Sequence, residues 1–314
     1  MKTYMVAGGA GFLGSHLVKR LMGIDANVIV VDDLCTGSID NIKQHFRSER
    51  FSFWNQSICT LNNNINIKLD GIFNFACPAS PVHYMRMPIE TNLTSTLGIY
   101  LLLQIAEDQK CKLLHTSTSE VYGDPQQHPQ KEDYYGNVNS YGPRACYDEG
   151  KRAAEAFMYD YRLHHGVDTR IVRIFNTYGP NMAVDDGRVV SNFIVQALRG
   201  EDITMYGDGT QTRSFCYVDD MINAILSVWS CEEQTPINVG NPGEFTMLEL
   251  AEKVLSLTES TSKIKFLPMP ENDPKQRRPD ISKMTQITGW RPHTSLDEGL
   301  VPTVEYFRNK LKGA

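Results

Sequence analysis

A glycine-rich turn between an apolar strand and an amphipathic helix is the feature that most restricts the possible folds of this chain. The segment from Gly8 to Gly14 directly follows the apolar run Tyr4–Ala7 and opens a helical pattern over Leu13–Met22. Glycine allows a tight turn and a close approach to the backbone, and the free amides at the helix start can hold a pyrophosphate. The pattern therefore predicts a dinucleotide site. Its expected residues are Gly8, Gly11, Phe12, Leu13 and Gly14.

The acidic residues after the second apolar run decide between two interpretations of this turn. Glycines alone would equally fit a tight strand-to-helix connection that holds no ligand. The run Val28–Val31, however, leads into Asp32 and Asp33, where a carboxylate can accept hydrogen bonds from the hydroxyls of the adenosine ribose. Because this carboxylate would repel a 2′-phosphate, we expect NAD in preference to NADP. Ala76, after a later apolar run, completes the expected cofactor residues.

The first half of the chain alternates short apolar runs with longer amphipathic segments. We expect strands at Tyr4–Ala7, Val28–Val31, Gly71–Phe75, Lys112–Thr116 and Thr169–Ile174. We expect helices at Leu13–Met22, Thr91–Glu107 and Tyr147–His164. This alternation predicts an α/β fold with a doubly wound parallel sheet of the Rossmann type. In such sheets ligands gather at the carboxyl ends of the strands.

The length of 314 residues exceeds what a single hydrophobic core usually supports, so we expect two lobes. After Asn176 the sequence changes to loops rich in glycine and aspartate, followed by an apolar helical pattern over Val189–Leu198. We therefore predict an NAD-binding domain over residues 1–176, with a return segment near 214–240. A smaller substrate-binding lobe would occupy residues 177–314.

Charge and cysteine content argue against several classes of function. The net charge is −6, and nucleic acid binding needs a clustered basic surface, so we expect no nucleic acid partner. The seven cysteines are scattered and contain no Cys-x-x-Cys pair, which is typical of a reduced intracellular protein. The chain enters an apolar strand at once and has no apolar run of membrane-spanning length, so we expect no targeting segment, no membrane partner and a cytoplasmic location. No compact metal-binding motif occurs, so we expect no metal.

Tyr147 and Lys151 form the candidate catalytic pair. A spacing of four residues places both side chains on one face of a helix. A neighbouring ammonium stabilises a phenolate and lowers the pKa of the phenol, which would make Tyr147 a proton carrier. Because such pairs also occur by chance on solvated helix faces, the interpretation depends on the remaining motifs.

Six further segments complete the pattern of motifs. They are Pro78–Pro81, His83–Met85, Ser117–Pro125, Gly142–Arg152, Asp186–Phe193 and Gln211–Arg213. Together with the glycine-rich turn, they make the chain similar to the extended short-chain dehydrogenase/reductases that act on nucleotide sugars. Within this group the chain resembles the UDP-glucuronate decarboxylases, and the similarity covers essentially its whole length.

The resemblance implies a reaction and a set of catalytic residues. In this family NAD oxidises C4 of UDP-glucuronate, carbon dioxide leaves from the resulting β-keto acid, and C4 is reduced again to give UDP-xylose. Tyr147 would be the acid/base, Lys151 would tune it and hold the nicotinamide ribose, and Thr118 would bind the C4 oxygen. Glu120 and Arg213 would serve the decarboxylation, with Arg213 holding the substrate carboxylate. Glu120 has an alternative interpretation as a carboxylate that only pairs with an arginine.

The same resemblance implies a second group of residues, which would bind the nucleotide sugar. They are Ser119, Asn176, Arg188, Tyr206, Gln211 and Arg277. Arg188 and Arg277 suit the diphosphate, because a guanidinium can donate two hydrogen bonds to phosphate oxygens. Tyr206 and Gln211 could equally be packing residues. Members of the family usually pair two long helices across an interface, so we expect a homodimer.

Four positions depart from the pattern that the resemblance leads us to expect. They are Ser57, Asn74, Cys77 and Ser95, where aspartate, histidine, serine and asparagine are usual. All four concern the cofactor side and leave other nucleotide-sugar enzymes open: a 4,6-dehydratase, a 4-epimerase or a C4 dehydrogenase that stops at the 4-keto stage. A dehydratase would be expected to carry an Asp-Glu pair in place of Ser119 and Glu120. A non-catalytic NAD-binding scaffold is the remaining alternative, which the retained tyrosine, lysine and threonine disfavour.

Overall fold

The computed structural model describes residues 1–268 and 277–313 of the chain. Within these residues, a parallel sheet of seven strands has the order β11-β6-β5-β4-β1-β2-β3. The strands are β1 (Thr3–Ala7), β2 (Asn27–Asp32), β3 (Phe51–Asn55), β4 (Gly71–Asn74), β5 (Lys112–Thr118), β6 (Thr169–Ile174) and β11 (Ile237–Val239). The doubly wound parallel sheet predicted from the sequence is confirmed. The strands β3 and β11 were not predicted. Both lie at the edges of the sheet; β3 is only partly buried and lacks a continuous apolar run, and β11 has three residues.

The strand order reverses between β1 and β4, and this reversal positions the site. Tyr4 of β1 is in register with Val28 of β2 on one side and with Gly71 of β4 on the other. The connections after β1 and β4 therefore leave toward opposite faces of the sheet. A crevice opens at the carboxyl ends of these two strands, which is where doubly wound sheets bind ligands.

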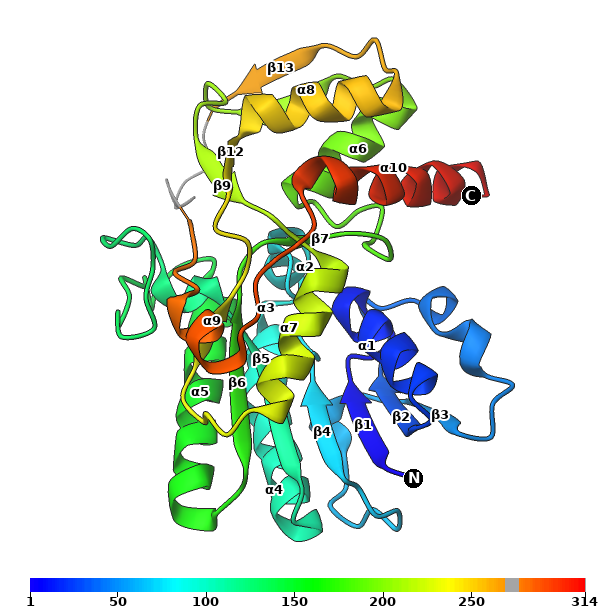
Figure 1. Cartoon of the computed structure of the whole chain (residues 1–314), viewed down its shortest axis with the longest axis vertical. Coiled ribbons are helices and arrows are strands. Elements are labelled where there is room, and N and C mark those ends of the chain that lie inside the picture. Colours follow the sequence, from blue (N-terminus) through cyan, green and yellow to red (C-terminus); the bar gives the residue numbers. More distant parts are fainter. Residues whose placement is uncertain (269–276, 314) are drawn as a thin grey trace.

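The sheet is buried on both faces because successive side chains of each strand point to opposite sides. In β1, Val6 belongs to the cluster that packs against α1 and α7, whereas Met5 belongs to the cluster that packs against α4 and α5. The four helices are α1 (Phe12–Gly23), α7 (Val218–Ser230), α4 (Ile99–Gln109) and α5 (Ala145–His165). Figure 1 shows α1 and α7 side by side over one face of the sheet.

The helix predicted over Thr91–Glu107 is present but interrupted. Pro88–Leu93 form α3, Thr94–Gly98 form a π-helical turn, and α4 follows. A π-helical turn inserts one extra residue, which a hydrophobic period of 3.6 residues does not reveal. Gly98 in this turn lies against Ile58, since a Cβ at Gly98 would come within 2.5 Å of that side chain.

The second lobe has its own core, shared by α6, α8 and α10. Its elements are α6 (Val189–Arg199), α8 (Met247–Thr258), α10 (Leu296–Lys312) and three strand pairs, β7 (Thr177–Tyr178) with β10 (Cys216–Tyr217), β9 (Thr212–Ser214) with β12 (Glu244–Thr246), and β8 (Ile203–Tyr206) with β13 (Ile264–Leu267). In Figure 1 this lobe lies above the carboxyl ends of the sheet strands. The remaining elements are α2 (Pro81–Arg86), α9 (Ser282–Thr288) and short 3₁₀ helices at Ile39–Asn41, Lys43–His45, Ile58–Thr60 and Ser119–Tyr122.

The chain does not remain in the second lobe after it first enters it. Helix α7 packs on α1, and β11 pairs with β6, so residues 218–239 extend the first lobe again before β12 and α8 return to the second. The domain limits at residues 176 and 177 stay a prediction.

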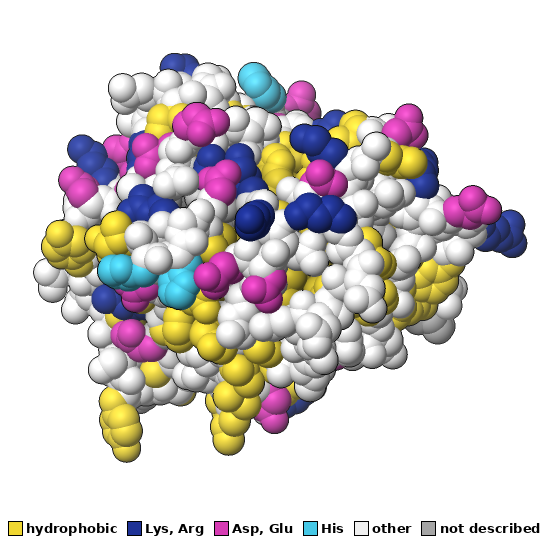
Figure 2. Space-filling model, turned by 90° about the horizontal axis from the view of Figure 1, so that it is seen from below, with side chains coloured by type: hydrophobic (Ala, Val, Ile, Leu, Met, Phe, Trp, Pro, Cys, Tyr) yellow, Lys and Arg dark blue, Asp and Glu magenta, His cyan; other side chains and the backbone are white. Residues whose placement is uncertain are grey.

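The surface carries charges of both signs. On the face shown in Figure 2, acidic and basic side chains are interspersed, and the part of the described chain visible there presents no continuous basic surface. In the described part of the chain, none of the helices combines the length and the apolar character needed to cross a bilayer.

Substitution of Gly14 by alanine tests the close contact at the start of α1. A Cβ at Gly14 would lie 2.1 Å from the carbonyl oxygen of Gly8, whereas a Cβ at Gly23, at the end of the same helix, would meet nothing within 4 Å. We expect Gly14→Ala to lower the free energy of unfolding by about 1–3 kcal/mol through overpacking. The matched control Gly23→Ala should leave it unchanged or raise it by up to about 1 kcal/mol. Urea unfolding measures both, and equal effects of the two substitutions would contradict the contact.

Candidate active site

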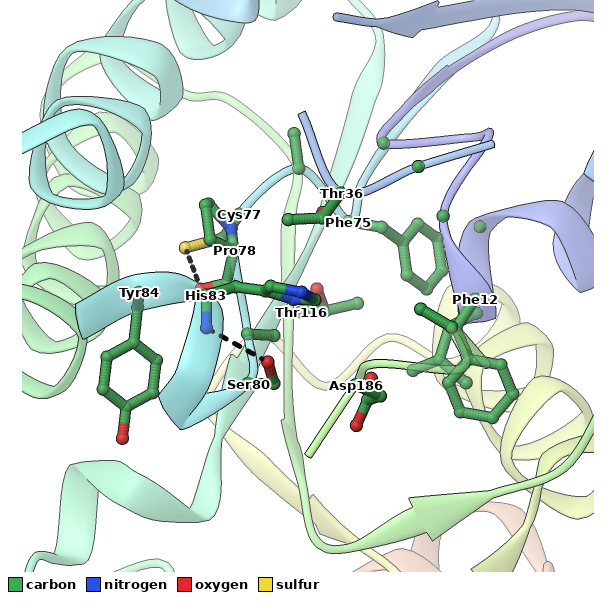
Figure 3. Close-up of a pocket in the computed structure, with 18 of the residues that line it drawn as sticks. Phe12, Thr36, Phe75, Cys77, Pro78, Ser80, His83, Tyr84, Thr116 and Asp186 are labelled. Carbon is green, nitrogen blue, oxygen red and sulfur yellow. Dashed lines mark hydrogen bonds between the residues drawn. The ribbon is translucent and has the colours of Figure 1, made fainter. Parts of the chain in front are cut away.

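A cavity of about 650 Å³ lies between the carboxyl edge of the sheet and the second lobe. It brings together most of the residues predicted from the sequence. The predicted residues that line it are Gly8, Gly11, Phe12, Leu13, Gly14, Asp32, Asp33, Ala76, Thr118, Ser119, Glu120, Tyr147, Lys151, Asn176, Arg188, Arg213 and Arg277. Figure 3 shows Phe12 and Asp186 on one side of this pocket and Cys77 and Tyr84 on the other.

Two predicted residues are not among the described residues that line the cavity. Tyr206 is 46% exposed at the end of β8. The side-chain amide of Gln211 donates a hydrogen bond of 2.5 Å to the carbonyl oxygen of Tyr206. The two residues therefore contact each other, and their role toward a nucleotide sugar stays a prediction.

The glycine-rich turn forms a cradle that side chains would fill. Gly8 has φ of +74°, and a Cβ there would lie 2.7 Å from the backbone nitrogen of Ala76. Gly11 is the N-cap residue of α1, and no side chain caps this end of the helix. The amides of the first turn therefore lie at the end of α1 that borders the cavity. The positive end of the helix dipole at this point attracts a pyrophosphate.

Asp32 closes the cradle on the side of β2. Its carboxylate accepts hydrogen bonds of 2.9 Å from the backbone N–H groups of Ala10 and Leu34. Burial raises the pKa of Asp32, and these two N–H groups oppose the shift. The held carboxylate retains lone pairs for the two hydroxyls of a ribose. The carboxylate of Asp32, as an acceptor, and the amides at the uncapped start of α1, as donors, together fit the adenosine and pyrophosphate parts of NAD.

The candidate catalytic pair lies on the first turns of α5. Tyr147 is buried, and its ring stacks on that of Tyr84 with a centroid distance of 5.0 Å and an interplanar angle of 6°. The ammonium of Lys151 donates a hydrogen bond of 2.8 Å to the carbonyl oxygen of Thr116 and lies 5.8 Å from the centroid of the Tyr147 ring. Tyrosine and lysine thus share one helix face, as the spacing predicts.

The electrostatics of Tyr147 differ from the simple expectation that the lysine lowers its pKa. Burial raises the pKa of the Tyr147 phenol, and a hydrogen bond with Thr118 opposes this only in part. Burial also lowers the pKa of Lys151. Because the ammonium is held at the carbonyl of Thr116 and beside the ring face, desolvation has the larger effect on the phenol.

Glu120 lies between two guanidinium groups. Arg144 donates to Oε2 at 2.8 Å, and Arg277 donates to Oε1 and, at 3.2 Å, to the carbonyl oxygen of Gly123. Burial raises the pKa of Glu120, but the charges of Arg277 and Arg144 outweigh it, so the pKa lies below its usual value. The ion pair that the sequence left as an alternative interpretation of Glu120 is therefore present in the structure.

The other two arginines of the cavity are also held by defined contacts. Arg213 of β9 lies beside Arg277 in a short parallel bridge, and its Nη1 donates to the carbonyl oxygen of Thr212 at 2.9 Å. Arg188 donates two hydrogen bonds, of 2.5 and 2.7 Å, to the carboxylate of Asp186. Both guanidinium groups line the cavity from the second lobe.

Three cavity residues that contact predicted site residues were not assigned a role from the sequence. Tyr84 stacks on Tyr147, Arg144 holds Glu120, and Asp186 holds Arg188. All three lie inside the segments that carry the family resemblance, so their position in those motifs was the only available signal. Their partners are distant in sequence or depend on loop geometry, which a pattern of residues does not predict.

Comparison with known proteins identifies the family. The sequence pattern of the GDP-mannose 4,6 dehydratase family matches residues 5–303. The chain is 51% identical to UDP-glucuronic acid decarboxylase 6 of Arabidopsis thaliana, over 98% of this chain and 89% of that protein. It is 48% identical to UDP-glucuronic acid decarboxylase 1 of Danio rerio, over 99% of this chain and 74% of that protein.

The chain belongs to this family of extended short-chain dehydrogenase/reductases.

Solved structures of the family agree with this assignment. UDP-glucose 4-epimerase of Thermotoga maritima, in complex with UDP-glucose, superimposes with a TM-score of 0.90 at 28% identity, over 98% of this chain and 99% of that one. UDP-glucuronic acid 4-epimerase of Bacillus cereus, in complex with UDP-glucuronic acid and NAD, gives a TM-score of 0.89 at 25% identity, over 98% and 99%. The fold of the chain is thus one that holds NAD and nucleotide sugars in related proteins.

All four departures from the family pattern make local contacts of their own. The side-chain oxygen of Asn74 accepts a hydrogen bond of 3.1 Å from the N–H group of Ala76. Cys77 and Ser95, which both depart from the pattern, lie in contact with a sulfur to oxygen distance of 3.2 Å. Ser57 caps the short helix Ile58–Thr60 by accepting a hydrogen bond from the backbone of Cys59. Each substituted side chain therefore has a structural partner on the cofactor side.

Substitution of Asp148 by asparagine tests the electrostatics next to Tyr147. Burial, followed by the charge of Glu120, raises the pKa of Asp148, and its buried Oδ1 has no hydrogen-bond partner among the described residues. A raised carboxyl pKa means that the unfolded state ionises first, so this group costs stability as the pH rises above the unfolded pKa of about 4. We expect Asp148→Asn to be more stable than the parent protein at pH 8, by on the order of 1 kcal/mol. The difference should close near pH 4.

Urea unfolding at several pH values measures this difference. The control is Glu149→Gln, one residue further along the same helix, whose carboxylate makes a partly exposed ion pair with Arg152 at 3.4 Å. Its effect should be small across the range. A stability difference for Asp148→Asn that does not change with pH would contradict the assignment.

Proposed function

We propose that the protein is an NAD-dependent UDP-glucuronate decarboxylase, a carbon-carbon lyase that forms UDP-xylose through a 4-keto intermediate. The observation that carries the proposal is the identity of 51% to a UDP-glucuronic acid decarboxylase over 98% of the chain. It is supported by the geometry of the cavity, which collects Tyr147, Lys151 and Thr118 beside the cradle that fits NAD.

Proton transfer at C4 is assigned to Tyr147. When bound, NAD supplies the reversible oxidation of C4 and is regenerated within each turnover. The phenolate of Tyr147 takes the proton of the C4 hydroxyl, and the phenol so formed returns it at the end. The hydroxyl of Thr118, which hydrogen-bonds to Tyr147, orients the C4 oxygen. The burial that raises the phenol pKa also excludes water, so the ammonium of Lys151 acts on the phenolate in a medium of low dielectric constant.

Loss of carbon dioxide is assigned to the cluster of charges around Glu120. Once C4 is a carbonyl, the C6 carboxylate is β to it, and the electrons of the C5–C6 bond can move into the carbonyl as carbon dioxide leaves. Arg213 lines the cavity where it can hold the carboxylate and then the enolate oxygen. The negative charge of Glu120, which both Arg144 and Arg277 hold in place, disfavours the substrate carboxylate and favours neutral carbon dioxide.

The nucleotide part of the substrate is assigned to the second lobe. Arg188 is fixed by Asp186, and Asn176 lines the cavity between the two lobes. A guanidinium already fixed by a carboxylate loses little side-chain freedom when it binds a diphosphate. Ser119 is buried beside Thr118 and is assigned a supporting contact to the sugar.

A 4-epimerase acting on the same sugar is the second candidate. The UDP-glucuronic acid 4-epimerase of Bacillus cereus shares the fold with a TM-score of 0.89, although at 25% identity. An epimerase product would keep the carboxylate and have the same mass as the substrate. A decarboxylase product would lack the carboxylate and be lighter by one carbon dioxide, so a mass spectrum of the product separates the two candidates.

Tyr147→Phe tests the catalytic assignment. The change removes only the phenol oxygen, so we expect a loss of UDP-xylose formation by about 10²- to 10⁴-fold, with the binding of NAD and UDP-glucuronate retained. Tyr135→Phe is the matched control, because Tyr135 is 89% exposed. Product formation is followed by liquid chromatography and binding by calorimetry. Turnover of Tyr147→Phe within tenfold of the parent protein would contradict the role of the phenol.

We also propose that the protein is a cytoplasmic homodimer. All seven cysteines are unpaired, which fits a reducing compartment. Exposed apolar side chains follow one face across α3, the π-helical turn and α4, and recur on α5. They are Ile89, Leu93, Leu97, Tyr100, Tyr159 and Leu163. An apolar stripe on two adjacent helices fits a self-complementary interface around a twofold axis.

Leu93→Glu tests this interface. The substitution places a charge in the apolar stripe, so we expect a shift from dimer to monomer in sedimentation velocity at micromolar concentration. Val301→Glu is the control, because Val301 is 55% exposed on α10, away from the stripe. A parent protein that sediments as a monomer would overturn the proposed dimer, and a dimeric Leu93→Glu variant would overturn the proposed interface.

A further inference from the structure

The C-terminal helix α10 connects the core of the second lobe with the cofactor side of the cavity. The side chains of Leu300 and Phe307 are buried in the core of the second lobe. Gly299 packs so closely on Tyr178 that a Cβ would lie 2.1 Å from the phenol oxygen. The first half of α10 is therefore fixed, and this sets the position of its last turns.

Two side chains from the last turns of α10, Tyr306 and Lys310, line the cavity. They are four residues apart and so lie on the same helix face. The cavity residues nearest in sequence to Asp32, on the loop after β2, are Asp33, Cys35, Thr36, Gly37, Ser38 and Asn41. The cavity is thus lined by the glycine-rich turn and the loop after β2 on the side of the first lobe, and by Tyr306 and Lys310 on the side of the second lobe.

An ion pair joins α10 to this loop. The ammonium of Lys310 lies 2.9 Å from Oδ2 of Asp40. The loop is in turn bound to the glycine-rich turn, because the N–H group of Ser38 and the side-chain amide of Asn41 both donate to the carbonyl oxygen of Ala10, at 3.0 and 2.9 Å. In Figure 1 the end of α10 lies beside the loop that follows β2.

The charges at this end of the cavity give the lysine a further role. Asp32 and Asp33 line it, and Asp40 lies next to it. A dinucleotide brings the negative charges of its pyrophosphate into this acidic region. Lys310 places a positive charge at the wall of this part of the cavity, whereas Lys43, which pairs with the same Asp40, is not among the described residues that line it.

We propose that Tyr306 and Lys310 form the outer wall of the adenosine part of the cofactor site, and that the ion pair between Lys310 and Asp40 fastens the second lobe over the bound dinucleotide. The inference rests on the NAD dependence of the proposed function. A contact between the two lobes then helps to retain the cofactor through successive turnovers, in addition to the glycine-rich turn and Asp32.

The test is the rate of NAD release from the full-length protein, measured without any nucleotide sugar. Lys310→Met keeps the length of the side chain and removes its charge. The matched control is Lys43→Met, because the ammonium of Lys43 also lies 2.9 Å from Asp40 but belongs to the same lobe. We expect Lys310→Met to release NAD about two- to fivefold faster, which is the range for a solvent-exposed ion pair. Lys43→Met should release NAD at the rate of the parent protein.

A double-substitution cycle separates the ion pair from other effects. Asp40→Asn should accelerate NAD release as Lys310→Met does, and the two changes together should add nothing further. High salt should reduce the difference between the parent protein and Lys310→Met, because salt screens an exposed pair. Thermal unfolding of the NAD-free variants should lie close to that of the parent protein, because a solvent-exposed ion pair contributes little to stability.

Unchanged NAD release in Lys310→Met, or equal acceleration in Lys43→Met, would overturn the inference. The result is independent of the reaction that the protein catalyses. A parent protein that binds NAD but leaves UDP-glucuronate unchanged would contradict the proposed function, while a difference in NAD release between the two lysine variants would still support the wall formed by α10.

Discussion

The close approach between the start of α1 and the glycine-rich turn is the contact on which the rest of the site depends. Gly14 packs against the carbonyl of Gly8, and Gly8 adopts a positive φ directly beside Ala76. Only a backbone without Cβ atoms fits there, so α1 can begin at the edge of the sheet where the strand order reverses. This places a helix N-terminus, a buried carboxylate and the loop after β4 around one crevice. The catalytic helix α5 reaches the same crevice from the other face of the sheet.

Burial is the second constraint, and it acts on the groups around Glu120, Arg188 and Tyr147. Removing ionised groups from water is costly, so buried charges are paired and hydrogen-bonded. The cavity follows this rule at Glu120, between two arginines, and at Arg188, on Asp186. Burial raises the pKa of Tyr147, so the phenolate that accepts the C4 proton in the proposed reaction depends on the nearby ammonium of Lys151. The cofactor loop, the charge cluster and the tyrosine thus share one region of low dielectric constant.

The sequence predicts the parts of this arrangement that are local and leaves out those that depend on contacts between distant segments. The alternating pattern suffices for the five inner strands of the sheet, the strand-glycine-helix pattern for the turn at Gly8–Gly14, and the four-residue spacing for the shared helix face of Tyr147 and Lys151. The π-helical turn at Thr94–Gly98 was missed because its extra residue does not change the hydrophobic pattern visibly. The pairing of Glu120 with Arg277 spans 157 positions, and no spacing rule connects them. The dominance of burial over the lysine at Tyr147 also required coordinates, because desolvation depends on what surrounds a side chain.

The central proposal is that the protein oxidises C4 only to release the C6 carboxylate, with no net redox change. The most direct measurement is mass spectrometry of the product formed from UDP-glucuronate in heavy water, with the absorbance of NADH followed in the same sample. We expect a UDP-pentose that has lost carbon dioxide and carries one carbon-bound deuterium. The absorbance of NADH should show no lasting rise. A 4-keto product with one NADH per molecule, or a UDP-hexuronate of unchanged carbon count, would contradict it.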